Sequence, residues 1–228
     1  MITLRPGKER GYAKYNWLET KHSFSFANYY DPRYMGVSEL LVINDDWVSP
    51  GTGFGTHPHR DMEIISYILE GSIEHKDTMG FHSILKAGDV QVMSAGTGIR
   101  HSEYNPSKSQ HLNFLQIWIQ PNQLGAKPSY QQNNFGDSQG ITLIVSPDGQ
   151  KGSLSIRQST RIYKLSQSDK DSSFTTVKGR TYYLHIARGS IKVNGTTVQS
   201  GDGATIKKEE ILSFTEPNKV EALLFELP

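Results

Sequence analysis

Short runs of apolar, β-branched and aromatic residues alternate along the chain with glycine, proline and polar residues that favour turns. Such runs are typical of β-strands, and we expect strands over residues 39–44, 64–69, 72–75, 90–93, 114–120, 142–145, 182–187, 190–193, 211–214 and 221–226. Apolar residues rarely recur with a helical period, so only one short helix is expected, around residues 15–21. Many short strands separated by turns predict an all-β sandwich or barrel.

A weak internal repeat divides this pattern into two halves. The segment around Gly71 resembles the segment around Gly189, because each reads as strand, glycine turn and strand. Each is followed by a Gly-Asp pair, at Gly88-Asp89 and at Gly201-Asp202. The repeat predicts two β-barrel domains joined near residues 121–131, where the apolar pattern lapses. We therefore place an N-terminal domain at residues 1–125 and a C-terminal domain at residues 126–228.

Composition excludes several classes of chemistry and partner. The 228 residues contain no Cys, which excludes disulfides, Cys-ligated zinc, iron–sulfur clusters and thiolate catalysis. The formal net charge of +1 provides no basic field for nucleic acid. The first residues lack the apolar core of a signal peptide, and no apolar run approaches the ~18 residues that span a bilayer. We expect a cytoplasmic monomer with no membrane or direct nucleic-acid contact.

Two glycine-rich segments carry the candidate chemistry. His57 and His59 follow one, and His101 and Glu103 follow the other. Residues two apart on an extended chain point to the same face, so the side chains of each pair converge. If the two segments are neighbours in a barrel, four candidate ligands meet inside it.

Three imidazoles and one carboxylate suit a divalent first-row metal, with Fe, Mn, Ni, Cu and Zn as candidates. A single His-x-His pair is weak evidence, because chance pairs are common in a chain with 8 His. The joint occurrence of both pairs, each after a glycine-rich turn, favours a metal site over structural histidines. An ion bound by four protein ligands keeps open positions for substrate, as a catalytic site requires.

The same segments resemble the pirin family of the cupin superfamily. The resemblance rests on His57-Pro58-His59-Arg60-Asp61-Met62-Glu63, on Met93-Ser94-Ala95-Gly96-Thr97-Gly98-Ile99 and on His101-Ser102-Glu103, and extends over most of the chain. It is strongest to the bacterial pirin-like quercetin 2,3-dioxygenases. It implies an all-β bicupin fold, in which only the N-terminal cupin domain binds metal. It also implies iron as the metal.

The spacing departs from the general cupin pattern. Glu63 stands one residue short of the usual glutamate position relative to Gly71, and His101 falls late after Gly96. In pirins the acidic ligand comes from the second motif, which here supplies Glu103. We therefore take His57, His59, His101 and Glu103 as the metal ligands, and expect Glu63 to support the ligands or to form a salt bridge. No His follows His185, so the second half has no corresponding cluster.

The resemblance implies a metal-dependent dioxygenase that opens the flavonol ring of quercetin-like substrates with O2. In this hypothesis Glu103 is both ligand and catalytic base. The alternative is a metal-bound, redox-responsive regulator that binds another protein, as some pirins do. A sugar-binding or isomerising cupin is the least favoured interpretation.

Other polar residues have weaker signals. His75 and Asp77 either line the mouth of the pocket or form a hydrogen-bonded strand end. Gln116 is placed to reach the cavity, whereas Trp118 on the same strand face is expected to pack in the core. The run Lys207–Glu210 is expected to be a solvated loop.

Overall fold

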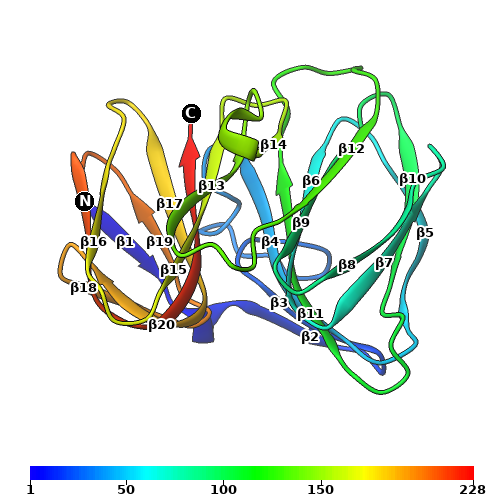
Figure 1. The fold of residues 1–228 in the computed structure, drawn as a ribbon, viewed down its shortest axis with the longest axis horizontal. Helices are drawn as coiled ribbons and strands as arrows, with labels where there is room; N and C mark the ends of the chain where they lie inside the picture. Colours follow the sequence, from blue (N-terminus) through cyan, green and yellow to red (C-terminus); the bar gives the residue numbers. More distant parts are fainter. The chain divides into compact units, whose positions relative to one another are not determined.

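The computed structural model describes residues 1–228, and β-strands joined by turns make up nearly all of it (Figure 1). The predicted all-β class is confirmed. The chain forms two compact units: residues 11–137 with 154–158, and residues 1–10 with 138–153 and 159–228. These units interleave along the chain, whereas the predicted domains divide it once, between residues 125 and 126; that division stays a prediction.

The unit built on residues 11–137 contains two antiparallel sheets. The larger has the strand order β12-β9-β6-β11-β4-β3-β2, and the smaller has the order β5-β10-β7-β8. The strands are β2 (Gly11–Lys14), β3 (Leu18–His22), β4 (Leu40–Val48), β5 (Gly53–His59), β6 (Glu63–Glu70), β7 (Ser72–Asp77), β8 (His82–Lys86), β9 (Asp89–Ser94), β10 (Ile99–Tyr104), β11 (Leu112–Ile119) and β12 (Ser129–Asn134), and the short β14 (Leu154–Ser155) belongs to the same unit.

Apolar side chains hold the two sheets of this unit together. One cluster is centred on Ile68, Ile73, Leu85 and Phe114, all fully buried. A second cluster contains Ile64, Met93 and Ile99. Burial of this many aliphatic and aromatic side chains is the main stabilising contribution, at about 1.5–3 kcal/mol for each. The polar side chains of the site described below lie within this framework.

The other unit is built on one antiparallel sheet and contains the two longest strands of the chain. Its elements are β1 (Ile2–Arg5), η1 (Gly7–Glu9), β13 (Gly140–Ser146), η2 (Gln150–Gly152), β15 (Arg161–Gln167), β16 (Ser172–Thr175), β17 (Thr181–Val193), β18 (Thr196–Gln199), β19 (Gly203–Ile206) and β20 (Ile211–Leu227). The order is β1-β19-β17-β20-β15-β13, with β16 added to β20 and β18 to β17. Its interior is filled by apolar side chains that include Leu184, Ile186, Phe214 and Leu224.

The glycines of the internal repeat occupy equivalent turns. Gly71 joins β6 to β7 with φ +74°, and Gly189 bends β17 with φ +71°. A Cβ atom on Gly71 would stand 2.5 Å from the carbonyl oxygen of His111, and one on Gly189 would stand 2.3 Å from that of Asn218. Glycine is required at both positions because no other residue combines this backbone conformation with so close an approach.

The predicted strands are all present, but the predicted helix at residues 15–21 is wrong. Leu18–His22 forms β3, which pairs with β2 and β4. Leu18, Thr20 and His22 are buried while the residues between them are half-buried, which is the period of a strand and not of a helix. As a strand paired on both sides, the segment has its backbone N–H and C=O groups hydrogen-bonded to β2 and β4. A short isolated helix would be only marginally stable in water.

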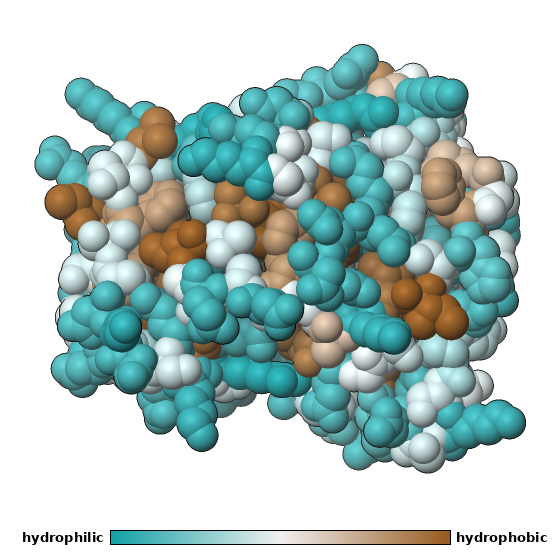
Figure 2. All heavy atoms as spheres, in the orientation of Figure 1, coloured by the Kyte–Doolittle hydropathy of each residue, from teal (hydrophilic) through white to brown (hydrophobic).

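None of the helical segments has the length and apolar character needed to cross a membrane. The visible surface is largely hydrophilic, with scattered apolar patches (Figure 2).

Candidate metal centre

Strands β5 and β10 bring the two histidine segments together. They pair in antiparallel register with His101 opposite His57, so the two segments are neighbours, which was the condition for their candidate ligands to meet. His57 and His59 project from one strand and His101 from its neighbour. Their ring centroids are 4.5–4.9 Å apart.

The three imidazoles present nitrogen atoms to one point. One nitrogen from each of His57, His59 and His101 lies within 4.8 Å of the other two. The Nε2 atoms of His57 and His101 are 3.1 Å apart. Nδ1 of His57 donates to the carbonyl oxygen of Gly55 at 2.8 Å, which leaves the Nε2 lone pair directed to the cluster.

Two histidines of the cluster, His59 and His101, lie in surroundings that lower the pKa of the imidazole. Burial, together with the neighbouring imidazoles of His101 and His57, lowers the pKa of His59 to about 4. Burial likewise lowers the pKa of His101 to about 3, together with His57 and His75. A metal requires the unprotonated ring, so this environment prepares the ligands at neutral pH.

Glu103 lies on the same strand as His101 but faces a different set of neighbours. Its carboxylate groups with His75 and His101, and their candidate ligand atoms also lie within 4.8 Å of one another. The pairing of β5 with β10 shifts register between His101 and Glu103, so Glu103 stands opposite Phe54. Glu103 nevertheless lies near the histidine cluster, because its charge acts on the pKa of the His59 imidazole.

Three neutral donors hold the buried Glu103 carboxylate. Oε1 accepts hydrogen bonds from Ser66 Oγ and Gln91 Nε2, each at 3.1 Å, and Oε2 accepts one from Gln116 Nε2 at 2.8 Å. The three donors come from three different strands, β6, β9 and β11, so together they fix the orientation of the carboxylate. Gln116 was predicted to reach the cavity, and this is confirmed; Ser66 and Gln91 lie too far away in sequence to be identified there.

His75 belongs to the site more closely than its sequence context predicts. Its side chain is fully buried, and Nε2 lies 3.0 Å from Oδ2 of the equally buried Asp77. Oδ1 of Asp77 accepts hydrogen bonds from the amides of Met79 and Phe81, which locks the carboxylate. The pair is therefore hydrogen-bonded and packed beside His101, and does not lie at an exposed pocket mouth. The His-x-Asp spacing was the available signal.

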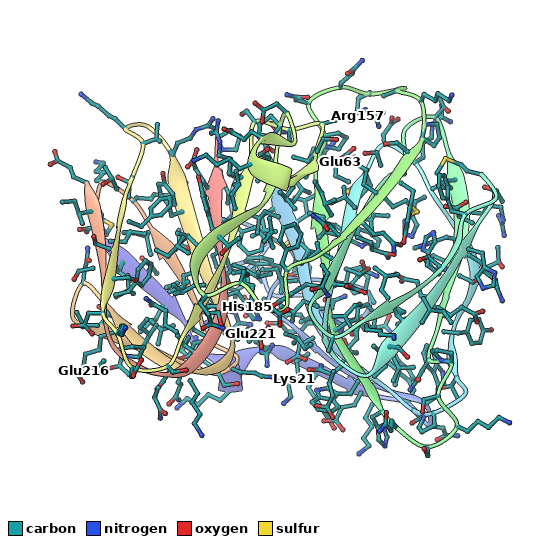
Figure 3. All side chains as sticks on the ribbon, viewed as in Figure 1. Lys21, Glu63, Arg157, His185, Glu216 and Glu221 are labelled. Carbon is teal, nitrogen blue, oxygen red and sulfur yellow. The ribbon has the colours of Figure 1, made fainter.

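Glu63 is held by hydrogen bonds, and the charge of Arg157 also acts on its carboxyl group. Its buried carboxylate accepts hydrogen bonds from Ser94 Oγ at 2.6 Å and from the Arg157 amide at 3.4 Å. Figure 3 shows Glu63 and Arg157 close together. Burial raises the pKa of Glu63. Glu63 forms no part of either ligand group, and its contacts instead anchor the 154–158 segment to β6 and β9.

Trp118 packs as expected and also touches the cluster. It lies against the apolar group of Ile64, Met93 and Ile99. Its ring meets His59 edge-on at 5.1 Å between centroids, so it limits the space on that side of His59.

Comparison with known proteins identifies the family. The family model described as Pirin matches residues 4–119 of this chain, which include every residue of the cluster. The chain belongs to the pirin family. A second model, described as the quercetinase C-terminal cupin domain, matches residues 143–227, so the predicted bicupin organisation is confirmed.

Full-length relatives support the same assignment. The chain is 47% identical to a quercetin 2,3-dioxygenase of Escherichia coli K12, covering 100% of this chain and 99% of that one. It is 41% identical to a pirin-like protein of Caulobacter vibrioides, covering 98% of each. Among solved structures, YhhW from E. coli superimposes with a TM-score of 0.97 at 47% identity, covering 100% of this chain and 98% of that chain.

The donor set of this pirin fits a divalent metal ion. A crystal structure of the bacterial pirin YhhW in complex with nickel(II) has a TM-score of 0.96 at 46% identity, covering 100% of this chain and 99% of that one. In the present chain, the Nε2 atoms of His57 and His101 lie 3.1 Å apart, and Nδ1 of His57 faces the carbonyl oxygen of Gly55, so the His57 Nε2 lone pair is directed at the cluster. With a cation bound, both rings would carry their proton on Nδ1 and offer the Nε2 lone pair as ligand. Both groups of candidate ligands lie in the unit built on residues 11–137.

Proposed function

We propose that this chain is a metal-dependent quercetin 2,3-dioxygenase, which opens the flavonol ring of quercetin-like substrates with O2. Similarity over the whole chain to the E. coli quercetin 2,3-dioxygenase supports the reaction. The observation that carries the metal dependence is the convergence of three imidazoles beside a buried carboxylate.

In this proposal His57, His59, His101 and Glu103 hold the metal. Four protein ligands leave about two positions of an octahedral ion for substrate or O2. The bound metal supplies a Lewis acid and a redox centre for reaction with O2. Iron is the metal we propose first, with Ni, Cu, Mn and Zn as alternatives, because three nitrogens and one oxygen suit all of these ions.

Glu103 also acts as the catalytic base. It takes the hydroxyl proton of the substrate's hydroxy-ketone onto a carboxylate oxygen, which activates the ring toward O2. Ser66, Gln91 and Gln116 keep the carboxylate oriented while it does so. Trp118 and His59 bound the adjacent space, which favours a flat aromatic substrate. The ring then opens, with both oxygen atoms of O2 entering the product and carbon monoxide leaving.

Oxygen uptake tests this proposal. Purified protein is reconstituted with iron, quercetin is added, and O2 consumption is followed, with Glu103→Ala as the variant. We expect uptake in the wild type and a loss of at least ~100-fold in the variant, since a ligand and a base are removed together. Copper, nickel and manganese are tested in turn if iron gives no uptake. Unchanged turnover in Glu103→Ala, or no uptake with any metal, contradicts the proposal.

The proposal also includes the division of the chain into two domains. We assign metal binding to the domain at residues 1–125 and no metal to the domain at 126–228. The location of both ligand groups among residues 57–103 supports this assignment. A monomeric, cytoplasmic protein remains our expectation.

The alternative of a metal-bound regulator is not favoured. A relative that is 47% identical over the whole chain is named a quercetin 2,3-dioxygenase, and one that is 41% identical is named a putative quercetin 2,3-dioxygenase. Neither is named as a regulator.

A further inference from the structure

The barrel without metal ligands has its own hollow, at the end of the unit where two turns meet. The hollow has a volume of about 790 Å³ and is lined by residues 175–181, between β16 and β17, and 207–210, between β19 and β20. Both turns lie at the upper left of Figure 1, in yellow and orange. Sites for small molecules commonly measure about 300–1,000 Å³, so the size suits such a ligand.

In the internal repeat, the turns around this hollow correspond to turns beside the metal cluster of the first barrel. In the first barrel, the corresponding turns, between β5 and β6 and between β9 and β10, also border a hollow, of about 500 Å³. That hollow is lined by His59 of the metal cluster. The same end of the fold is thus open in both barrels, although the interior of the second is filled with apolar side chains. A ligand of the second barrel must therefore bind at the mouth and not inside.

The lining of the hollow is predominantly basic. Lys178, Arg180, Lys207 and Lys208 contribute four positive charges, against two from Glu209 and Glu210. Glu209 already binds the amino group of Met1 and the Asn194 side chain. The ammonium groups of Lys178, Lys207 and Lys208 form no ion pair, so their charges are available to an anion in the hollow.

Arg180 is held in place at the hollow by a buried carboxylate. Its Nε lies 3.8 Å from Oε1 of Glu226, which is 2% exposed. Nη1 of Arg180 also donates to Ser159 Oγ at 3.2 Å. Arg161 donates to the same Glu226 oxygen at 2.9 Å, so the carboxylate has a fixed position. A guanidinium oriented in advance loses little entropy when it binds a ligand.

Apolar surface accompanies the positive charge. Val177 is 51% exposed in the turn before β17, and the side chains of Thr175, Thr176 and Thr181 line the hollow beside it. Hydrophilic side chains project over this end of the unit in Figure 2, with apolar atoms between them. An inorganic anion would use the charges and leave this apolar wall in water, whereas an aromatic acid covers both.

We propose that this hollow is a binding site for an aromatic carboxylate. The carboxylate is held between the Lys178 and Arg180 side chains of one turn and the Lys208 side chain of the other, and the ring lies on Val177. The site is separate from the metal cluster, and its occupancy does not depend on the dioxygenase activity.

Calorimetric titration of the full-length, metal-loaded protein with 2-naphthoate tests the proposal. The double variant Lys178→Gln/Lys208→Gln removes one charge from each turn, and we expect about tenfold weaker binding, equivalent to ~1.4 kcal/mol. Lys170→Gln is the matched control, because this exposed lysine precedes β16 in the same unit but does not line the hollow. The control is expected to bind as the wild type does.

Two further probes decide the ligand class. 2-Naphthol has the ring without the charge, and inorganic phosphate has the charge without the ring; each is expected to bind at least tenfold more weakly than 2-naphthoate. Phosphate binding as tight as naphthoate binding overturns the aromatic assignment. The proposed site is overturned if Lys170→Gln and the double variant lose the same amount of 2-naphthoate affinity. It is also overturned if 2-naphthoate does not bind saturably, or if the double variant binds it as tightly as the wild type does.

Discussion

Three neutral side chains orient the Glu103 carboxylate, and Gln116 makes the shortest contact, at 2.8 Å. The other amide atom of Gln116, Oε1, is buried without a hydrogen-bond partner. The residue is therefore retained at a cost to the core, since a buried acceptor without a partner is unfavourable. The role of Gln116 is therefore to orient the Glu103 carboxylate and not to stabilise the barrel.

Gln116→Leu is expected to weaken metal binding by about 10–100-fold, the usual effect of removing a partner of a ligand. The thermal midpoint is expected to change little, because leucine has a similar size and also removes the unsatisfied Oε1. Competition with a chelator measures the affinity, and Gln123→Leu, at an exposed position, is the control. Metal affinity equal to that of the wild type would show that Gln116 does not position Glu103.

A second buried carboxylate in the same barrel makes stability depend on pH. Burial raises the pKa of Asp46 from 3.8 to about 7, and nearby Asp45 and Glu103 act in the same direction. Between these values the folded protein holds a proton that the unfolded chain releases. The free energy of unfolding therefore falls as the pH rises from about 4 to 7.

Asp46→Asn removes this dependence by keeping the side chain neutral. We expect the variant to be more stable than the wild type at pH 8, by roughly 1–4 kcal/mol, with a smaller difference at pH 5. Urea unfolding at both pH values measures the effect, with the exposed Asp137→Asn as control. A difference that is the same at pH 5 and pH 8 would show that Asp46 is ionised in both conditions.

At the scale of elements, the metal centre depends on how closely β5 and β10 approach. Gly53 pairs with Tyr104, and a Cβ atom at Gly53 would stand 2.2 Å from the carbonyl oxygen of Glu103. Gly55 lies two residues further along the same strand, and a Cβ atom there would meet nothing within 4 Å. Glycine is therefore required at position 53 by the close approach of β10, whereas at position 55 the structure has room for a side chain.

Gly53→Ala is expected to push β5 away from β10, to lower stability by about 1–3 kcal/mol and to weaken metal binding. Gly55→Ala is expected to leave both properties close to the wild type. Thermal unfolding and chelator competition are measured on both variants. Equal behaviour of the two variants would mean that the strands tolerate the wider spacing.

The elements also show where sequence analysis succeeds and fails. Strands with continuous apolar runs, such as β6, β9 and β11, are recognisable because both of their faces are largely buried. β3 carries its signal on alternate residues with polar partners, and the same residues were assigned to a helix. β5 is mostly half-buried or exposed, so only its histidines indicated its role.

For the whole molecule, metal binding should stabilise one unit and not the other. Both ligand groups lie in the unit built on residues 11–137, and the other unit has a continuous apolar interior of its own. A ligand present at 100 times its dissociation constant stabilises the folded state by about 2.7 kcal/mol. That stabilisation belongs to the unit that contains the site.

Removal of metal with a chelator is expected to lower the unfolding temperature of the metal-binding unit by several degrees, roughly 2–8 °C. Calorimetry with hydrogen exchange assigns the change, since amides of β5 and β10 should lose protection and those of β17 should not. His57→Ala, treated in the same way, should show no further change. Equal loss of protection in β5 and β17 would show that the two units unfold together.

The sequence by itself determined the all-β class, the repeat around Gly71 and Gly189, and the histidine and glutamate pairs that converge through the two-residue period of a strand. These features are local, because alternation and turn chemistry act between neighbouring residues. Tertiary structure alone decided the hydrogen-bond partners of Glu103, the burial of His75 with Asp77 and the charged hollow of the second barrel. Each of these joins side chains from separate strands or turns, whose register depends on the packing of the whole sheet.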